Sequence, residues 1–132
     1  MFDPKTHILV VDDMLTMRKL VIKSCKEMGF TEFTEAKDGR EAWDKLSTSK
    51  PPIGLIISDW NMPNASGLDL LKRVRGETRF KQVPFVLVTA EAEKEQIFAA
   101  VKAGVSGYIV KPFTTDILKE KFEAIHSKLS GN

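Results

Sequence analysis

The stretch His7-Ile8-Leu9-Val10-Val11-Asp12-Asp13 decides the fold of this chain. An almost continuous apolar run, rich in β-branched side chains, leads directly into two adjacent carboxylates. A run of this kind is typical of a parallel strand that is covered on both faces. In sheets built from such strands, ligands bind at the carboxyl ends of the strands. The stretch therefore predicts a parallel sheet with a functional site at its carboxyl edge.

The same pattern recurs along the chain. Leu55-Ile56-Ile57, Phe85-Val86-Leu87-Val88 and Tyr108-Ile109-Val110 are further apolar runs of strand length. Glu32-Phe33-Thr34-Glu35-Ala36 is half polar, which suits a strand at the edge of a sheet better than one at its centre. Helical segments separate these runs. Five strands that alternate with five helices predict an α/β fold, with helices on both faces of a parallel sheet and right-handed crossovers.

The predicted helices are marked by apolar spacing and by end signals. Asp38-Gly39-Arg40-Glu41 fits a capping box that opens the second helix. Gly29 and Gly104 end the first and the fourth helix. In chain order, the positions that mark the five helices are Met17, Leu20, Val21, Ser24, Cys25 and Met28; residues 38–46; Leu68, Leu71 and Val74; residues from about 92 to 103; and Leu118, Phe122, Ile125 and Leu129.

Length and composition are those of one globular domain. The chain has 132 residues, 42% of them hydrophobic and 29% charged, so we expect a single domain over 1–132. Its one cysteine excludes an internal disulfide. No apolar run reaches the roughly 20 residues that span a bilayer, and the N-terminus lacks the apolar core of a signal peptide. A net charge of +2 gives no argument for nucleic acid. We expect a cytoplasmic monomer with no membrane or nucleic-acid partner.

Polar side chains follow four of the five predicted strands. Asp12-Asp13 ends the first strand, Asp59 the third, Thr89 the fourth and Lys111 the fifth. The weak edge strand ends in Ala36-Lys37, without an acid or a hydroxyl. Because the carboxyl ends of parallel strands meet at one edge, we expect these side chains to form a single site.

Three carboxylates at one place repel each other by about 4 kcal/mol per pair at 4 Å and an effective dielectric near 20. A hard cation removes this cost, and oxygen ligands favour Mg²⁺, whereas zinc would need histidine or cysteine ligands. A metal, an ammonium and a hydroxyl suit a phosphoryl group, and a carboxylate can accept one without a base. Spacing alone leaves the nucleophile open. Asp12 and Asp13 are adjacent and suited to share the metal, so the solitary Asp59 is the better candidate.

At these positions the sequence resembles the two-component response regulator receiver domains, and among them the CheY-type chemotaxis regulators. The resemblance covers nearly the whole chain. It implies a flavodoxin-like (CheY-like) doubly wound sheet in the order 2-1-3-4-5, for which CheY is itself a standard example. The motifs that carry it are Asp12-Asp13, Asp59-Trp60-Asn61-Met62-Pro63-Asn64, Gly67, Thr89-Ala90-Glu91, Tyr108 and Lys111-Pro112-Phe113.

The resemblance also implies a role for each residue of the predicted site. Asp59 would be phosphorylated. Asp13, Asp59 and the backbone carbonyl of Asn61 would bind Mg²⁺ directly, and Asp12 would act through a metal-bound water. Lys111 would pair with the phosphoryl oxygens, and the Lys111-Pro112 peptide bond would be cis.

The implied switch connects this site to a partner surface. Thr89 would hydrogen-bond to the phosphoryl group, and Tyr108 would move inward behind it. The surface of the fourth helix, fifth strand and fifth helix would then change shape. An apolar arc with a basic rim predicts a helix-binding surface there, and in the family it binds an acidic N-terminal segment of the flagellar motor switch protein. The predicted surface comprises Lys94, Ile97, Val101, Tyr108, Ile117, Lys119 and Lys121.

Input and output are both expected to come from other proteins. The chain ends with the fifth helix, so we expect it to act by binding and not as an enzyme on an external substrate. His7 lies in the first strand and His126 in the last helix, away from Asp59, which implies a separate histidine kinase of the chemotaxis type. Asn61 and Glu91 flank the site as in the family and suggest fast self-dephosphorylation and a dedicated phosphatase.

Three other functions share part of this pattern. A Mg²⁺-dependent phosphatase of the haloacid-dehalogenase kind would need a second carboxylate two residues after its nucleophile, where Asn61 stands. A flavin binder would need a hydroxyl- and glycine-rich loop after the first strand, in place of Asp12-Asp13-Met14. A receiver that serves as a phosphorelay carrier, or that regulates a non-flagellar target, stays open as the serious alternative.

Overall fold

The computed structural model describes residues 1–90 and 93–129. Its five strands form one parallel sheet in the order β2-β1-β3-β4-β5, which confirms the predicted topology. The half-polar strand β2 lies at an edge of the sheet, as its composition predicts. The strands are β1 (His7–Val11), β2 (Glu32–Ala36), β3 (Leu55–Asp59), β4 (Phe85–Thr89) and β5 (Gly107–Val110).

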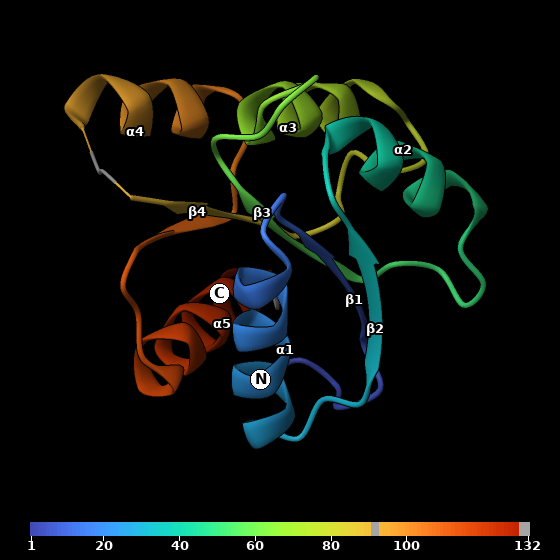
Figure 1. Ribbon diagram of the computed structural model, residues 1–132, viewed down its shortest axis with the longest axis vertical. Helices are drawn as coiled ribbons and strands as arrows, with labels where there is room; N and C mark the ends of the chain where they lie inside the picture. Colours follow the sequence, from blue (N-terminus) through green and yellow to red (C-terminus); the bar gives the residue numbers. More distant parts are fainter. Residues whose placement is uncertain (91–92, 130–132) are drawn as a thin grey trace.

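Helices cover both faces of the sheet (Figure 1). One face is covered by α1 and α5, and the other by α2, α3 and α4. No helix within the described residues is both long enough and apolar enough to cross a membrane. The helices are α1 (Leu15–Glu27), α2 (Gly39–Thr48), α3 (Gly67–Gly76), α4 (Lys94–Lys102) and α5 (Thr115–Leu129).

The central strands are buried on both sides. In β1, Ile8 and Val10 belong to the core cluster under α1 and α5, whereas Leu9 and Val11 belong to the cluster under α2, α3 and α4. Successive side chains of a strand point to opposite faces, so both sets of positions must be apolar. This double burial explains the uninterrupted apolar runs in the sequence. Cys25 is buried in the first cluster, where burial raises the pKa of its thiol to about 12.

Two helical positions differ from the prediction. In α1, Leu20 is 45% exposed, and Ile22 is buried together with Val21 and Cys25. The apolar residues of α1 occupy a broad arc, so spacing alone did not settle which side of the arc faces the sheet. In α5, Leu129 is exposed because it lies one turn beyond Ile125, the last buried residue of that helix.

The capping box predicted at α2 is only half formed. The Asp38 carboxylate accepts a hydrogen bond from the Glu41 backbone N–H at 2.8 Å, but the Glu41 carboxylate accepts one from the Lys37 N–H and not from that of Asp38. A complete box, not predicted from the sequence, opens α3. There the Ser66 hydroxyl accepts from the Asp69 N–H, and the Asp69 carboxylate accepts from the Ser66 N–H.

Helix α4 is attached to the core differently from the other helices. It begins at Lys94, and its predicted start near Ala92 lies outside the described residues. Ala100 is the one fully buried residue of its nine, whereas each other helix buries three or four. Beyond its end, Gly104 has φ +93°, and its carbonyl accepts a 2.8 Å hydrogen bond from the Arg75 side chain. The described part of α4 is therefore fixed mainly at its C-terminal end.

Candidate functional site

The register of the sheet brings the acidic residues together. Val11 of β1 pairs with Ser58 of β3, so Asp12 follows β1 at the level of Asp59. Asp12, Asp13 and Asp59 each offer a carboxylate oxygen, and the three oxygens lie within 4.8 Å of one another. The predicted acidic cluster is therefore present at the carboxyl edge of the sheet.

The cluster is partly open to solvent. Asp12 and Asp59 are 4% and 8% exposed, whereas Asp13 is exposed. Burial raises the pKa of Asp12, although a 2.9 Å hydrogen bond from the Met14 backbone N–H acts in the opposite direction. Trp60, which follows Asp59 directly, is half-buried and so can report optically on events at the cluster.

Lys111 supplies the positive charge of this site. Its Nζ lies 3.0 Å from Asp59 Oδ1 and 3.5 Å from Asp12 Oδ2. Burial by itself lowers the pKa of Lys111, but the hydrogen bond to Asp59 and the charges of both carboxylates raise it above its ordinary value. The Lys111-Pro112 peptide bond is cis, as the resemblance implies.

The donor set fits a hard divalent cation. It consists of the oxygens of three carboxylates, and the Lys111 ammonium pairs with two of them, so these four described side chains together are net negative. Such a site suits Mg²⁺, which prefers oxygen ligands and keeps several waters, and the exposed side at Asp13 leaves room for them. Asn61 lies in the exposed loop two residues after Asp59 and stays a predicted ligand through its carbonyl.

The two predicted switch residues lie on neighbouring strands. Thr89 is buried at the end of β4, and the Lys111 backbone N–H donates to its carbonyl at 2.8 Å. Leu87 pairs with Tyr108, and both contact the cluster under α2, α3 and α4. Because side chains alternate along a strand, Thr89 points to the same face as Leu87 and Tyr108. Glu91, predicted to flank the site, lies outside the described residues.

The loop after β3 reaches the site through a close backbone approach. The Gly67 N–H donates to the Trp60 carbonyl at 2.8 Å. A Cβ at position 67 would clash with the carbonyl oxygen of Asp59 and lie 2.8 Å from Leu87 Cδ2. The start of α3 therefore packs directly against the backbone that carries Asp59, and only glycine fits there.

Arg18 was not among the residues predicted to form the site. Its guanidinium donates to the Asp12 carbonyl oxygen at 2.7 Å and to the Glu35 carboxylate at 2.9 Å. The signal that could have found it is an arginine one turn and a half after the acidic pair, on the helix that begins there.

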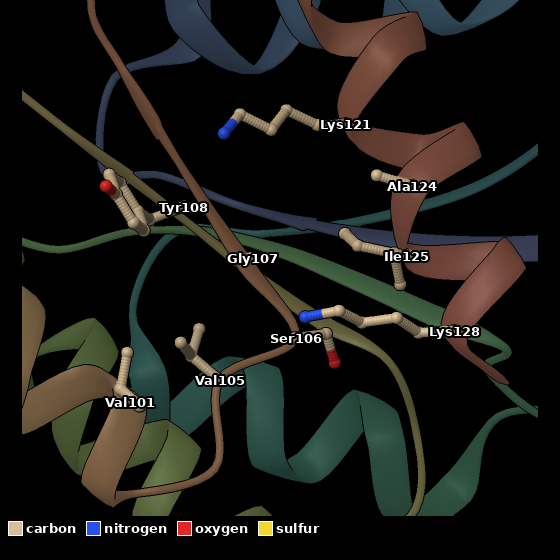
Figure 2. Close-up of a pocket in the computed structure, with 9 residues that line it drawn as sticks. All are labelled: Val101, Val105, Ser106, Gly107, Tyr108, Lys121, Ala124, Ile125 and Lys128. Carbon is tan, nitrogen blue, oxygen red and sulfur yellow. The ribbon is translucent and has the colours of Figure 1, made fainter. Parts of the chain in front are cut away.

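A second candidate site lies on the predicted partner surface. A pocket of about 310 Å³ opens between α4, β5 and α5 (Figure 2). Of the predicted residues, Val101, Tyr108 and Lys121 line it, and the Lys121 Nζ lies 5.2 Å from the centre of the Tyr108 ring. The pocket is also lined by Val105, Ser106, Gly107, Ala124, Ile125 and Lys128, which were not predicted.

The other predicted surface residues lie outside this pocket. Ile117 is 42% exposed, while Ile97 is half-buried. Phe98, also on α4, is 66% exposed. The predicted residues that do not line the pocket are Lys94, Ile97, Ile117 and Lys119.

Comparison with known proteins agrees with this architecture. The family described as response regulator receiver domain matches residues 8–123. The chain is 46% identical over 118 residues to chemotaxis protein CheY1 of Helicobacter pylori, covering 89% of this chain and 94% of that protein. It is 45% identical over 124 residues to chemotaxis protein CheY of Pseudomonas aeruginosa, covering 94% and 98% of the two chains.

Solved structures give the same result. Chemotaxis protein CheY4 of Vibrio cholerae superposes with a TM-score of 0.83 at 31% identity, over 92% of this chain and 98% of that one. The receiver domain of a signal transduction histidine kinase from Syntrophus aciditrophicus also gives a TM-score of 0.83, at 25% identity, over 96% and 94% of the two chains. The chain therefore belongs to the response regulator receiver domain family, and it is similar over most of its length to chemotaxis proteins of the CheY type.

Proposed function

We propose that the chain is a single receiver domain over 1–132 that acts as a phospho-acceptor switch, with Asp59 as the acceptor. The observation that carries this proposal is the position of the Asp59 carboxylate, which is nearly buried, contacts the Lys111 ammonium at 3.0 Å and shares one cluster with Asp12 and Asp13. A carboxylate held in this way can act as a nucleophile without a base.

The reaction transfers a phosphoryl group from a phosphohistidine of a kinase. An Asp59 carboxylate oxygen attacks phosphorus, the phosphorus–nitrogen bond breaks, and the histidine leaves with the bonding electrons. Mg²⁺ would be held by Asp13, Asp59 and the Asn61 carbonyl, and by Asp12 through a water, and it would offset the repulsion between carboxylates and phosphoryl oxygens. Lys111 would hold a phosphoryl oxygen, since its ammonium already contacts Asp59. No described histidine lies in the acidic cluster, so the donor comes from a second protein.

The signal then passes along β4 and β5. The phosphoryl group adds charge and acceptor oxygens beside Thr89, which becomes a hydrogen-bond donor to them. Thr89 and Tyr108 share a face of the sheet on neighbouring strands, so a shift of the first changes the space open to the ring of the second. Tyr108 lines the pocket between α4, β5 and α5, and this position supports that pocket as the output surface.

A fluorescence titration tests this function. We expect Mg²⁺ to change the emission of Trp60, and a small phosphodonor or beryllofluoride to change it further only when Mg²⁺ is present. Trp43 can be replaced by phenylalanine to isolate the signal of Trp60. A donor response that is independent of Mg²⁺, or no response with phosphate found on another residue by mass spectrometry, would contradict the proposal.

Removing Lys111 should strengthen Mg²⁺ binding. Lys111→Ala takes away a cation that competes for the same carboxylates, and we expect an apparent Mg²⁺ affinity roughly tenfold higher. The melting temperature without Mg²⁺ should fall, because Asp12 and Asp59 are left without their counter-charge. Calorimetric titration and thermal unfolding with and without Mg²⁺ measure both effects. Weaker Mg²⁺ binding in this variant would contradict the assigned role.

We further propose that the output partner is the flagellar motor switch, through its acidic N-terminal segment. The similar proteins named above are chemotaxis proteins, and the pocket combines apolar walls with Lys121 and Lys128. Lys121→Glu should weaken binding of such a peptide about tenfold, because the charge of a half-buried lysine on the pocket wall is reversed. Lys45→Glu, an exposed change on α2, is the matched control and should leave binding unchanged.

The alternative is a receiver with a non-flagellar target. The similarity to a receiver domain of a histidine kinase supports this alternative, because that domain is not named as a chemotaxis protein. Binding of the motor-switch peptide distinguishes the flagellar from the non-flagellar function. If Asp59 is phosphorylated but the motor-switch segment binds equally with and without phosphodonor, the target lies elsewhere. A dedicated phosphatase and a cytoplasmic location stay predictions from the sequence.

A further inference from the structure

The geometry points to Arg18 as a positioning residue that fixes the backbone between Asp12 and Asp13 and so sets the Mg²⁺ affinity of the acidic cluster. Arg18 itself contributes no ligand. This inference rests on the proposed Mg²⁺ site, and it assigns to that site a determinant on the helix that follows it.

Two hydrogen bonds connect Arg18 to the site and to the edge strand. Its Nη1 donates to the Asp12 carbonyl oxygen at 2.7 Å, and its Nε donates to Glu35 Oε1 at 2.9 Å. The other Glu35 oxygen accepts from Lys19 Nζ at 2.7 Å. Only 15% of the Arg18 side chain is exposed. The planar guanidinium thus holds the end of β1 against β2 with a fixed fork geometry.

Few other interactions restrain the turn that Arg18 contacts. Met14 is the N-cap of α1 and makes no side-chain capping hydrogen bond. Inside the turn, the Asp12 carboxylate accepts from the Met14 N–H at 2.9 Å. Asp13 is exposed, so packing does little to orient it. A rotation of the Asp12–Asp13 peptide would move both carboxylates relative to Asp59, and the Arg18 bond to the Asp12 carbonyl opposes that rotation.

Mutation of Arg18 should have opposite effects on Mg²⁺ affinity depending on whether Arg18 acts by its position or only by its charge. The positive charge of Arg18 is paired with Glu35, whose pKa is lowered mainly by the hydrogen bond from Lys19 and further by that from Arg18. If Arg18 acted only as a nearby charge, its removal would tighten Mg²⁺ binding, and lysine would substitute for it. If it acts by position, both alanine and lysine weaken Mg²⁺ binding, because lysine lacks the fork that reaches two acceptors.

The experiment is a Mg²⁺ titration of the full chain followed by Trp60 fluorescence and by calorimetry. We expect Arg18→Ala and Arg18→Lys to weaken Mg²⁺ binding about tenfold, as removal of an outer partner of a metal ligand typically does. Lys19→Ala is the matched control, since it removes the other cation on Glu35 without touching Asp12, and it should change affinity less than twofold. Circular dichroism must first establish that each variant is folded at the titration temperature.

Two results would overturn the inference while leaving the proposed function intact. One is tighter binding in Arg18→Ala with no change in Arg18→Lys, and the other is unchanged affinity in both. Glu35→Gln provides a second variant if Arg18→Ala does not fold, and we expect it to weaken Mg²⁺ binding several-fold by loosening the fork. Absence of Mg²⁺ binding in the unmodified protein would overturn the proposed site itself, and with it this inference.

Discussion

Asp59→Asn is expected to abolish phosphorylation and the phosphodonor-dependent change in Trp60 fluorescence. The neutral amide is not a nucleophile towards phosphorus, and it removes the charge that Lys111 contacts at 3.0 Å. It also leaves the metal cluster with two carboxylates in place of three, so Mg²⁺ should bind more weakly. Incubation with a small phosphodonor and Mg²⁺, followed by intact mass measurement, gives the extent of phosphorylation directly.

The matched control is Asp44→Asn, an equal change of charge on the exposed surface of α2. It should be phosphorylated to the same extent as the unmodified protein. Persistent phosphorylation of Asp59→Asn at the normal rate would show that Asp12, Asp13 or another residue is the acceptor. Spacing in the sequence left that choice open, so this variant tests the preference for Asp59 more directly than any other.

Gly67→Ala is expected to destabilise the fold by about 3 kcal/mol, which corresponds to a melting temperature lower by roughly 10 °C. The added methyl group would collide with the carbonyl oxygen of Asp59 and press against Leu87. Backbone cannot move aside as a flexible side chain can, so either α3 or the end of β3 must shift. Thermal unfolding monitored by circular dichroism measures the loss of stability. Because Asp59 is displaced, the acidic cluster should also bind Mg²⁺ less tightly.

Gly76→Ala is the control at the other end of the same helix. A Cβ there meets no atom within 4 Å. Because alanine has the higher helix propensity, this variant should be as stable as the unmodified protein or up to about 1 kcal/mol more stable. Equal effects of the two substitutions would mean that the close approach at Gly67 is not what limits stability.

The sheet could be predicted because its central strands are covered on both faces. Double burial forces long apolar runs such as His7–Val11, and these have few other interpretations. The helix positions were harder to predict. Leu20 and Ile22 are both apolar and two residues apart, and which one is buried depends on the rotation of α1 against the sheet, a tertiary property.

The acidic cluster could be predicted for a topological reason. Residues at the carboxyl ends of parallel strands converge at one edge of the sheet. The proximity of Asp12, Asp59 and Lys111 could therefore be predicted without knowing any distance. The contacts of Arg18 could not be predicted in the same way, because they depend on a side chain that reaches back to a carbonyl. The pocket was foreseen only in part, since Val105 and Lys128 reach it from a loop and from the last turn of α5.

Because α4 buries fewer side chains than α5, displacing α4 requires less free energy than displacing α5. Withdrawing the buried methyl group of Ala100 and the half-buried side chain of Ile97 from the core costs about 2 kcal/mol of transfer free energy. Displacing α5 would uncover Leu118, Phe122 and Ile125, at about 1.5–3 kcal/mol each. We therefore expect that a chemical signal of a few kcal/mol can move the α4 wall of the pocket between α4, β5 and α5 while the α5 wall stays in place.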